Sequence, residues 1–309
     1  MIDTHAHLNS FEFEEDREEI IKKCSDVGIG MINVGTHLKN SKKAIEIAET
    51  HSGVFASIGL HPLDIDSAFL KNKGYSGETE GILEKSFDYK KYRELAKSKK
   101  VVAVGECGLD YWYKPKGTSK KEKFKLEQIK IFEQHLDLAE ELELPVILHC
   151  RAAFDDLFAI LSKRKITGVL HCFTGSREDA ERFLSLGMYI GINGIMFKMD
   201  LKGAIEYIPM DKILLETDCP YLSPPLPRRS PVGQRRASLY GGQSLPSNEP
   251  DKNSDYDFLN GSQGPGWTEQ RNTPLSLPII AGEIAKIKNI EIEKVIEASD
   301  ENAKKLFKI

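Results

Sequence analysis

The chain begins with Met1-Ile2-Asp3-Thr4-His5-Ala6-His7, a stretch predicted to be a short strand that ends in the pattern His-x-His. Side chains alternate between the two faces of a strand, so His5 and His7 are expected to point the same way. Two imidazoles side by side provide half of a binding site for zinc or another divalent transition metal. A pair of solvated histidines near a frayed terminus is the competing interpretation, and the later strands decide between the two.

Seven further apolar segments are predicted to be strands, at residues 29–35, 54–59, 101–106, 145–149, 168–171, 188–192 and 213–218. Helical periodicity separates nearly all of them, at 14–27, 41–51, 88–99, 120–142, 154–163 and 176–186, and two more helices, at 278–288 and 291–307, end the chain. This alternation predicts an α/β fold with a parallel sheet, and eight such units close into a (β/α)8 TIM barrel. A doubly wound sheet is the alternative, but the Gly-rich phosphate turn that usually follows its first strand is absent.

The chain is long enough for one large hydrophobic core or two modest ones. The 309 residues carry a net charge of −4, so no global field attracts nucleic acid, and such binding needs local basic patches. Five cysteines at irregular spacing argue against a disulfide framework. The chain shows neither a signal-peptide pattern nor an apolar run long enough to cross a membrane. We therefore predict a cytoplasmic protein that does not associate with membranes, with a monomer favoured.

The composition changes between Ser223 and Pro274, where proline, glycine, serine and asparagine replace the apolar periodicity. We predict that residues 1–309 form a single barrel with a polar insert at about 224–270, mobile over 226–264. Four arginines lie in the insert, at positions 228, 229, 235 and 236. These arginines are expected to belong to a solvent-exposed loop, and a loop that binds phosphate is the alternative.

Polar residues recur where the predicted strands end. His5 and His7 are joined in this pattern by the following residues: Glu106, His149, His171 and Asp218. The carboxyl ends of barrel strands meet at one mouth, where active sites are built. A single catalytic zinc takes three protein ligands, whereas this set fits two divalent cations that share a bridging carboxylate. Each residue alone has an ordinary structural explanation, but that explanation is improbable for all of them together.

The motifs resemble those of the TatD family of metal-dependent DNases. The matching stretches are Asp3-Thr4-His5-Ala6-His7, Gly59-Leu60-His61-Pro62, Gly105-Glu106-Cys107-Gly108-Leu109-Asp110, His149-Cys150-Arg151, His171-Cys172-Phe173-Thr174-Gly175, Glu216-Thr217-Asp218-Cys219-Pro220 and Arg271-Asn272-Thr273-Pro274. The resemblance covers nearly the whole chain. It departs between Pro224 and Arg271, where this chain is about forty residues longer than the family pattern.

The resemblance implies hydrolysis of DNA phosphodiester bonds, commonly as an exonuclease, by a metal-activated water. It also implies that His5, His7, Glu106 and Asp218 hold one metal ion, and that Glu106, His149 and His171 hold the other. The metal is Mg, Mn or Zn, and its identity stays open.

Asp218 is expected to act as general base beside the bridging Glu106. Arg151 and His61 are expected to grip the phosphate of the DNA substrate.

Two other functions stay open. An amide or ester hydrolase on the same metal site, such as a D-aminoacyl-tRNA deacylase, needs the same activated water. A non-enzymatic binding protein on a decayed barrel is the third hypothesis. The stretch Tyr111-Trp112-Tyr113-Lys114 favours nucleic acid, because aromatic and basic residues at the mouth stack bases and bind phosphates.

Overall fold

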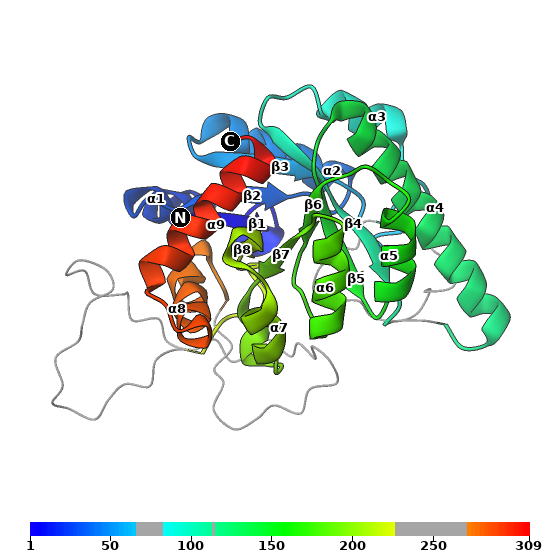
Figure 1. Ribbon diagram of the computed structural model, residues 1–309. Coiled ribbons are helices and arrows are strands. Elements are labelled where there is room, and N and C mark those ends of the chain that lie inside the picture. The colour runs from blue at the N-terminus through cyan, green and yellow to red at the C-terminus, as the bar shows by residue number, and fades with distance from the viewer. Residues whose placement is uncertain (66–82, 113–114, 226–270) are drawn as a thin grey trace, which may run out of the picture.

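The computed structural model describes residues 1–65, 83–112, 115–225 and 271–309, drawn in colour in Figure 1. Nearly all of the predicted insert at 224–270 lies outside these residues, as do Tyr113 and Lys114. Among the described residues, every helix is too short or too polar to cross a lipid bilayer.

Eight parallel strands form one sheet in the order of the sequence, β1 to β8. They are β1 (Ile2–Ala6), β2 (Gly30–Val34), β3 (Val54–Ile58), β4 (Val101–Asp110), β5 (Val146–Arg151), β6 (Gly168–Leu170), β7 (Tyr189–Ile192) and β8 (Ile213–Leu215). The segment after β8 returns to β1: the backbone N–H of Asp218 donates to His5 O and the N–H of His7 donates to Cys219 O, each at 2.8 Å. The predicted (β/α)8 TIM barrel is therefore confirmed.

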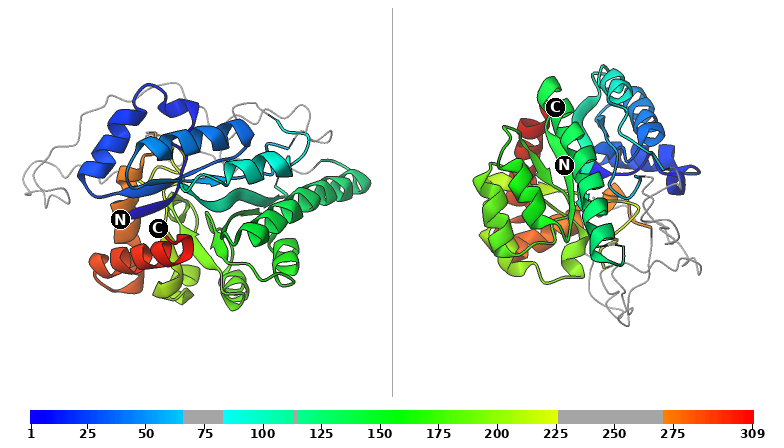
Figure 2. Two further views of the ribbon diagram at one scale, coloured as in Figure 1. Left: turned by 90° about the horizontal axis from the view of Figure 1, so that it is seen from above. Right: turned by 90° about the vertical axis from the view of Figure 1, so that its right-hand side faces the viewer.

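The helices lie outside the strands in all three views (Figures 1 and 2). They are α1 (Arg17–Asp26), α2 (Leu38–Thr50), α3 (Tyr89–Leu95), α4 (Thr118–Leu142), α5 (Phe154–Leu161), α6 (Arg177–Ser185), α7 (Lys202–Tyr207), α8 (Leu277–Lys288) and α9 (Ile292–Phe307). Their ends carry recognisable caps. Ser176 and Asp179 form a reciprocal capping box at the start of α6, and Asn289, with φ of 53°, ends α8.

Along each of three strands, the side chains on one face are apolar deep in the barrel and polar at its mouth. Ile147, Val169 and Leu214 belong to one buried cluster that also contains Leu306 and Phe307 of α9. The end of α9 therefore packs on this cluster and helps to close the barrel at that end. Two positions further along the same strand faces come His149, His171 and Glu216. The same face of each strand thus supplies the barrel core first and polar side chains next.

Three details of the predicted fold were wrong. Glu106 does not end its strand, because β4 continues to Asp110. Asp218 lies beyond β8, in a left-handed conformation with φ of 59°. The short helix α7 was not predicted, because its six residues are too few to show a helical period.

Candidate metal centre and substrate cavity

His5, His7, Glu106 and Asp218 converge at the mouth of the barrel. Nε2 of His5 lies 3.1 Å from Nε2 of His7 and 3.2 Å from Oε2 of Glu106. Nε2 of His7 lies 3.4 Å from Oδ1 of Asp218. All four residues are buried, so the nitrogens and carboxylate oxygens face one another with little access to water.

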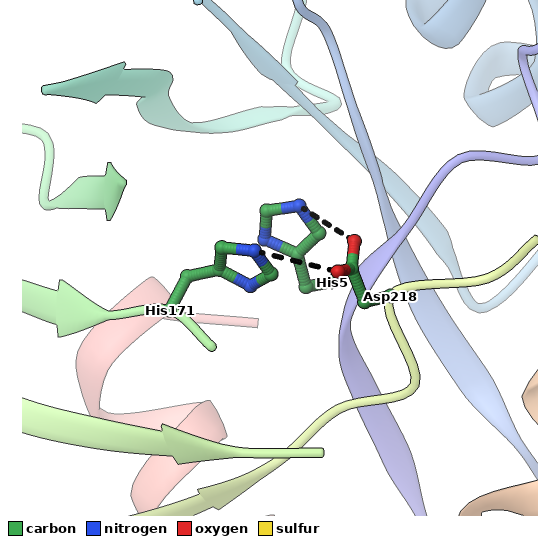
Figure 3. Close-up of side chains that lie close together, drawn as sticks. All are labelled: His5, His171 and Asp218. Atoms are coloured by element: carbon green, nitrogen blue, oxygen red, sulfur yellow. Dashed lines mark ion pairs between the residues drawn. The ribbon is translucent and has the colours of Figure 1, made fainter. Parts of the chain in front are cut away.

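Asp218 also faces His171. Its Oδ1 lies 3.8 Å from Nε2 of His5 and its Oδ2 lies 3.8 Å from Nε2 of His171, as the dashed lines in Figure 3 show. The His5 and His171 rings stack with centroids 3.4 Å apart. His5, His171 and Asp218 thus place three possible ligand atoms within 4.8 Å of one another.

His149 and His171 are each held from behind by a buried carboxylate. His149 places Nδ1 at 3.0 Å from Oε1 of Glu106 and Nε2 at 3.0 Å from Oδ2 of Asp110. His171 points Nε2 toward the centre and Nδ1 toward Oε1 of Glu216, at 3.0 Å. A carboxylate on the far nitrogen of a metal-binding histidine fixes the ring and makes it a better ligand.

His61 lies inside the cluster as well. It is 1% exposed, and its Nε2 lies 3.4 Å from Oε1 of Glu106. Together with Glu106 and His149 it forms a second group of possible ligand atoms within 4.8 Å. The structure therefore places His61 where it is able to contact either a metal ion or a phosphate.

Asp3 joins the first strand to the segment after the last one. Its Oδ1 accepts hydrogen bonds from the backbone N–H groups of Thr217, at 2.9 Å, and His5, at 3.2 Å. Its Oδ2 accepts from the Thr217 hydroxyl at 2.5 Å. These bonds give Asp3 a structural role, because they fix His5 relative to Asp218.

Asn272 holds the same segment from the outside. Its backbone N–H donates to Pro220 O at 3.0 Å, and its side-chain amide donates to Thr217 O at 2.9 Å and Tyr221 O at 2.7 Å. Asn272 therefore clamps the stretch that carries Asp218.

The charges of the cluster are strongly coupled. Burial alone would raise the pKa of Glu106, but the surrounding histidines outweigh it and hold this pKa well below its usual range. Burial and the neighbouring His171 lower the pKa of His5 to about 4. Burial also disfavours protonated His149 and His171, but the adjacent carboxylates outweigh it and raise their pKa values to about 9 and 10. The neighbouring histidines likewise lower the pKa of Asp218 against the effect of burial, so Glu106 and Asp218 are ionised and able to bind a cation.

The donor set fits divalent cations. Two ring nitrogens that each bind an ion at about 2.1 Å are able to lie about 3 Å apart, the spacing of the His5 and His7 nitrogens. Imidazole and carboxylate together suit zinc and manganese, and carboxylate oxygens suit magnesium. Nδ1 of His5 is buried without a hydrogen-bond partner in the described part of the chain, so Nε2 is the nitrogen of this ring that faces possible ligands.

A cavity of about 280 Å³ opens onto the cluster. Arg151 lines it, and Asp110 holds the guanidinium through Nε and Nη2, each at 2.7 Å. Burial opposes the ionisation of Asp110, but His149 and Arg151 outweigh it and lower its pKa to about 2. A fixed cation therefore stands beside the candidate ligands, where a phosphate would meet it.

Sequence reasoning gave no role to Asp110 or Glu216, although both stand in the quoted motifs. Glu216 had a usable signal, because it precedes Asp218 by two residues and so shares its face in the strand predicted at 213–218. Gly191 makes room for it: a Cβ there would lie 2.3 Å from Oε2 of Glu216. Tyr111 was expected at the mouth but is 4% exposed, and Lys125 covers its ring at 4.5 Å.

The barrel and its buried histidine–carboxylate cluster define a metal-dependent hydrolase. The chain belongs to the TatD related DNase family, whose family model matches residues 2–308. It is 32% identical to the 3'-5' ssDNA/RNA exonuclease TatD of Pantoea sp. (strain At-9b) over 318 aligned residues, which cover 100% of both chains. It is 30% identical to the metal-dependent hydrolase YabD of Bacillus subtilis (strain 168), over 100% of this chain and 99% of that protein.

Solved structures show the same fold. The crystal structure of YJJV, a TatD homolog from Escherichia coli k12, has a TM-score of 0.72 at 25% identity and covers 100% of this chain and 98% of its own. An amidohydrolase from Saccharomyces cerevisiae has a TM-score of 0.69 at 19% identity, covering 99% of each chain, and supports the fold alone.

Proposed function

We propose that this chain is a deoxyribonuclease that hydrolyses the phosphodiester bonds of DNA as an exonuclease. The carrying observation is the buried cluster in which His149 and His171 face Glu106 while Asp110 and Glu216 hold their far nitrogens. The exonuclease activity named for the relatives supports the choice of a nucleic acid as the substrate.

Two divalent cations, Mg²⁺, Mn²⁺ or Zn²⁺, would occupy the cluster. The residues proposed to hold them are His5, His7, Glu106, His149, His171 and Asp218, with Glu106 between the two ions. Glu106 suits this place because Oε2 faces His5 at 3.2 Å while Oε1 faces His149 at 3.0 Å. Such ions supply an activated water near neutral pH and neutralise charge on the phosphoryl oxygens.

The protein's own groups bind the substrate and move the proton. Arg151 is pre-oriented by Asp110, so its guanidinium is able to bind a phosphate without losing further rotamer freedom. His61, whose Nε2 lies 3.4 Å from Oε1 of Glu106, would contact the same phosphate. The carboxylate of Asp218 reaches toward His5, His7 and His171, and as general base it would take the proton of the attacking water.

We further propose that residues 1–309 act as one barrel domain, monomeric and cytoplasmic. The five cysteines support a reducing compartment, because all of them are free thiols.

The decisive experiment uses the purified protein, first treated with chelator and then given Mg²⁺, Mn²⁺ or Zn²⁺. It is tested on single-stranded and double-stranded DNA labelled at either end, with an aminoacyl-tRNA as the control substrate. Metal-dependent release of mononucleotides from one DNA end is the expected result. Deacylation of the tRNA without DNA cleavage would contradict the proposal and identify an ester hydrolase on the same site.

A further inference from the structure

Two kinds of side chain line the cavity beside the metal cluster. The first kind comprises the candidate ligands and Arg151. The second kind is apolar, with these principal members: Trp112, Phe154, Ile195 and Met199. The proposed hydrolysis of a phosphodiester uses the first kind and leaves the apolar lining residues without a role.

Trp112 stands out among the apolar lining residues. It is 44% exposed, and it is the one large exposed hydrophobic residue in the described part of the chain that lines the cavity. Exposed aromatic surface at a binding site is typical of a recognition platform, because burying it on a ligand is favourable. Phe154 is better fixed, since its ring packs edge-on against Phe173 at a centroid distance of 5.9 Å.

Asp110 couples Trp112 to the polar side chains of the cavity. Its Oδ1 accepts the backbone N–H of Trp112 at 3.0 Å, while its Oδ2 faces both His149 and the Arg151 guanidinium. The start of the Trp112 loop and the phosphate-binding arginine are thereby anchored to one buried carboxylate. A ligand held by Arg151 is therefore bound next to the segment that carries Trp112.

We propose that the cavity contains a subsite for one unpaired nucleobase, that of the substrate's terminal nucleotide, with Trp112 as the stacking surface. This inference rests on the proposed nuclease function and names the part of the substrate that the site selects. A base combines a flat apolar face with a phosphate a few bonds away, which matches an exposed tryptophan beside a fixed cation.

The dimensions favour a single base. A cavity of about 280 Å³ lies at the lower end of the range of small-ligand pockets, roughly 300–1,000 Å³, so it has no room for a base pair. A terminal base has to leave its duplex partner before it enters. The subsite therefore discriminates in favour of single-stranded or frayed ends, and it reads stacking surface and not base identity.

The test compares two oligonucleotides that differ only in the terminal base. One ends in an ordinary nucleotide. The other ends in an abasic analogue, in which a tetrahydrofuran replaces the base-bearing sugar and the phosphate is kept. We expect the parent enzyme to favour the intact end in kcat/KM by about 5- to 150-fold, the range that one base–aromatic stack provides. Trp112→Ala should abolish this preference through KM, leaving the abasic substrate unaffected, and Trp112→Phe should retain most of it.

Leu126→Ala is the matched control, because Leu126 is an exposed apolar residue, at 63%, that does not line the cavity. It should leave the preference at the parental value. Equal cleavage of both ends by the parent enzyme would overturn the subsite while leaving the nuclease function intact. An equal loss on both substrates in Trp112→Ala would also overturn it, because that result indicates a structural role.

A binding measurement makes the inference independent of turnover. In a Trp267→Phe background, Trp112 is the remaining tryptophan of the chain. Deoxyadenosine 5'-monophosphate should quench its fluorescence, and deoxyribose 5-phosphate should not. Quenching without cleavage of any oligonucleotide would contradict the proposed function and support the base subsite. Equal quenching by both probes would overturn the subsite.

Discussion

His149 and His171 are similar in their inner contacts and different in what holds them. Each faces Glu106 with one nitrogen and a buried carboxylate with the other. Asp110, behind His149, also binds the permanent cation of Arg151. Glu216, behind His171, has no arginine or lysine partner among the described residues; besides His171 it accepts from the backbone N–H of Cys172 at 2.7 Å and the side-chain amide of Asn193 at 3.0 Å.

Because of this difference, we expect the two carboxylates to have different roles. Asp110 links a candidate metal ligand to the groups expected to touch the substrate, so its loss should affect both metal and substrate binding. Glu216 orients His171 alone, so its loss should affect the metal centre only. Buried polar networks of this kind are coupled, and the coupling has to be measured residue by residue.

Asp218→Asn should have the largest effect, since Asp218 stands in front of His171 and not behind it. The amide retains the shape and one metal-binding oxygen but is unable to take a proton. Turnover should fall by roughly 10²–10⁴ with much less change in DNA binding. Metal content must be measured on the same sample. Parental turnover by a fully metallated variant would remove the general-base role and leave Asp218 as a ligand.

Asp110→Asn should follow, with a loss in kcat/KM of up to about 100-fold. The neutral amide leaves the guanidinium of Arg151 without its buried counter-charge, so KM for DNA should rise together with the metal concentration needed for activity. Asp137→Asn is the control, because Asp137 also pairs with an arginine, Arg164, but on the surface. A variant in which only metal affinity changes would make the two histidine–carboxylate pairs equivalent.

Glu216→Gln should cost about tenfold, at the lower end of the range for residues that support a metal ligand. The glutamine oxygen still accepts from the Cys172 N–H and the Asn193 amide, so the backbone around His171 should hold. Titration with metal should show weaker binding with an unchanged KM for DNA at saturating metal. An increase in this KM would contradict the division of labour between Glu216 and Asp110.

His135→Gln should leave turnover at pH 7 unchanged and affect stability alone. His135 is buried against neutral partners, accepting the N–H of Leu60 at 2.9 Å and contacting Ile131 O at 2.8 Å, and burial lowers its pKa to about 4. Below its ordinary pKa of 6.5 the unfolded chain binds a proton that the folded chain refuses, so stability is lost as pH falls from about 6.5 toward 4.

Chemical denaturation at pH 7 and pH 5 measures this effect. The parent's free energy of unfolding should drop between the two pH values by about 2 kcal/mol more than that of the variant. His51→Gln, a change beside Glu18 on the surface, provides the comparison. Identical pH dependence in parent and His135→Gln would show that the neutral surroundings of His135 do not hold its pKa down.

The fold was readable from the sequence because strands and helices alternate with clear periods. The candidate ligands were readable because residues two apart on a strand share a face, as Ile147 and His149 do. The extension of β4 to Asp110 could not be predicted from the sequence. It depends on Gly108, where a Cβ would lie 2.0 Å from His149 O, and such close contact between strands leaves no local pattern. His61, beyond the end of β3, was expected to face a phosphate, but its contact with Glu106 was not predicted.

The clamp formed by Asn272 has a consequence for how this barrel tolerates change. Asn272 hydrogen-bonds Thr217, Pro220 and Tyr221, so the two points where the chain leaves and re-enters the barrel are tied directly together. The geometry at Asp218 therefore depends little on the length of the chain between these two points. Closing a flexible connection costs only about 0.6 kcal/mol more for each doubling of its length. This junction is therefore expected to tolerate insertions, because added residues there leave the candidate metal centre unchanged.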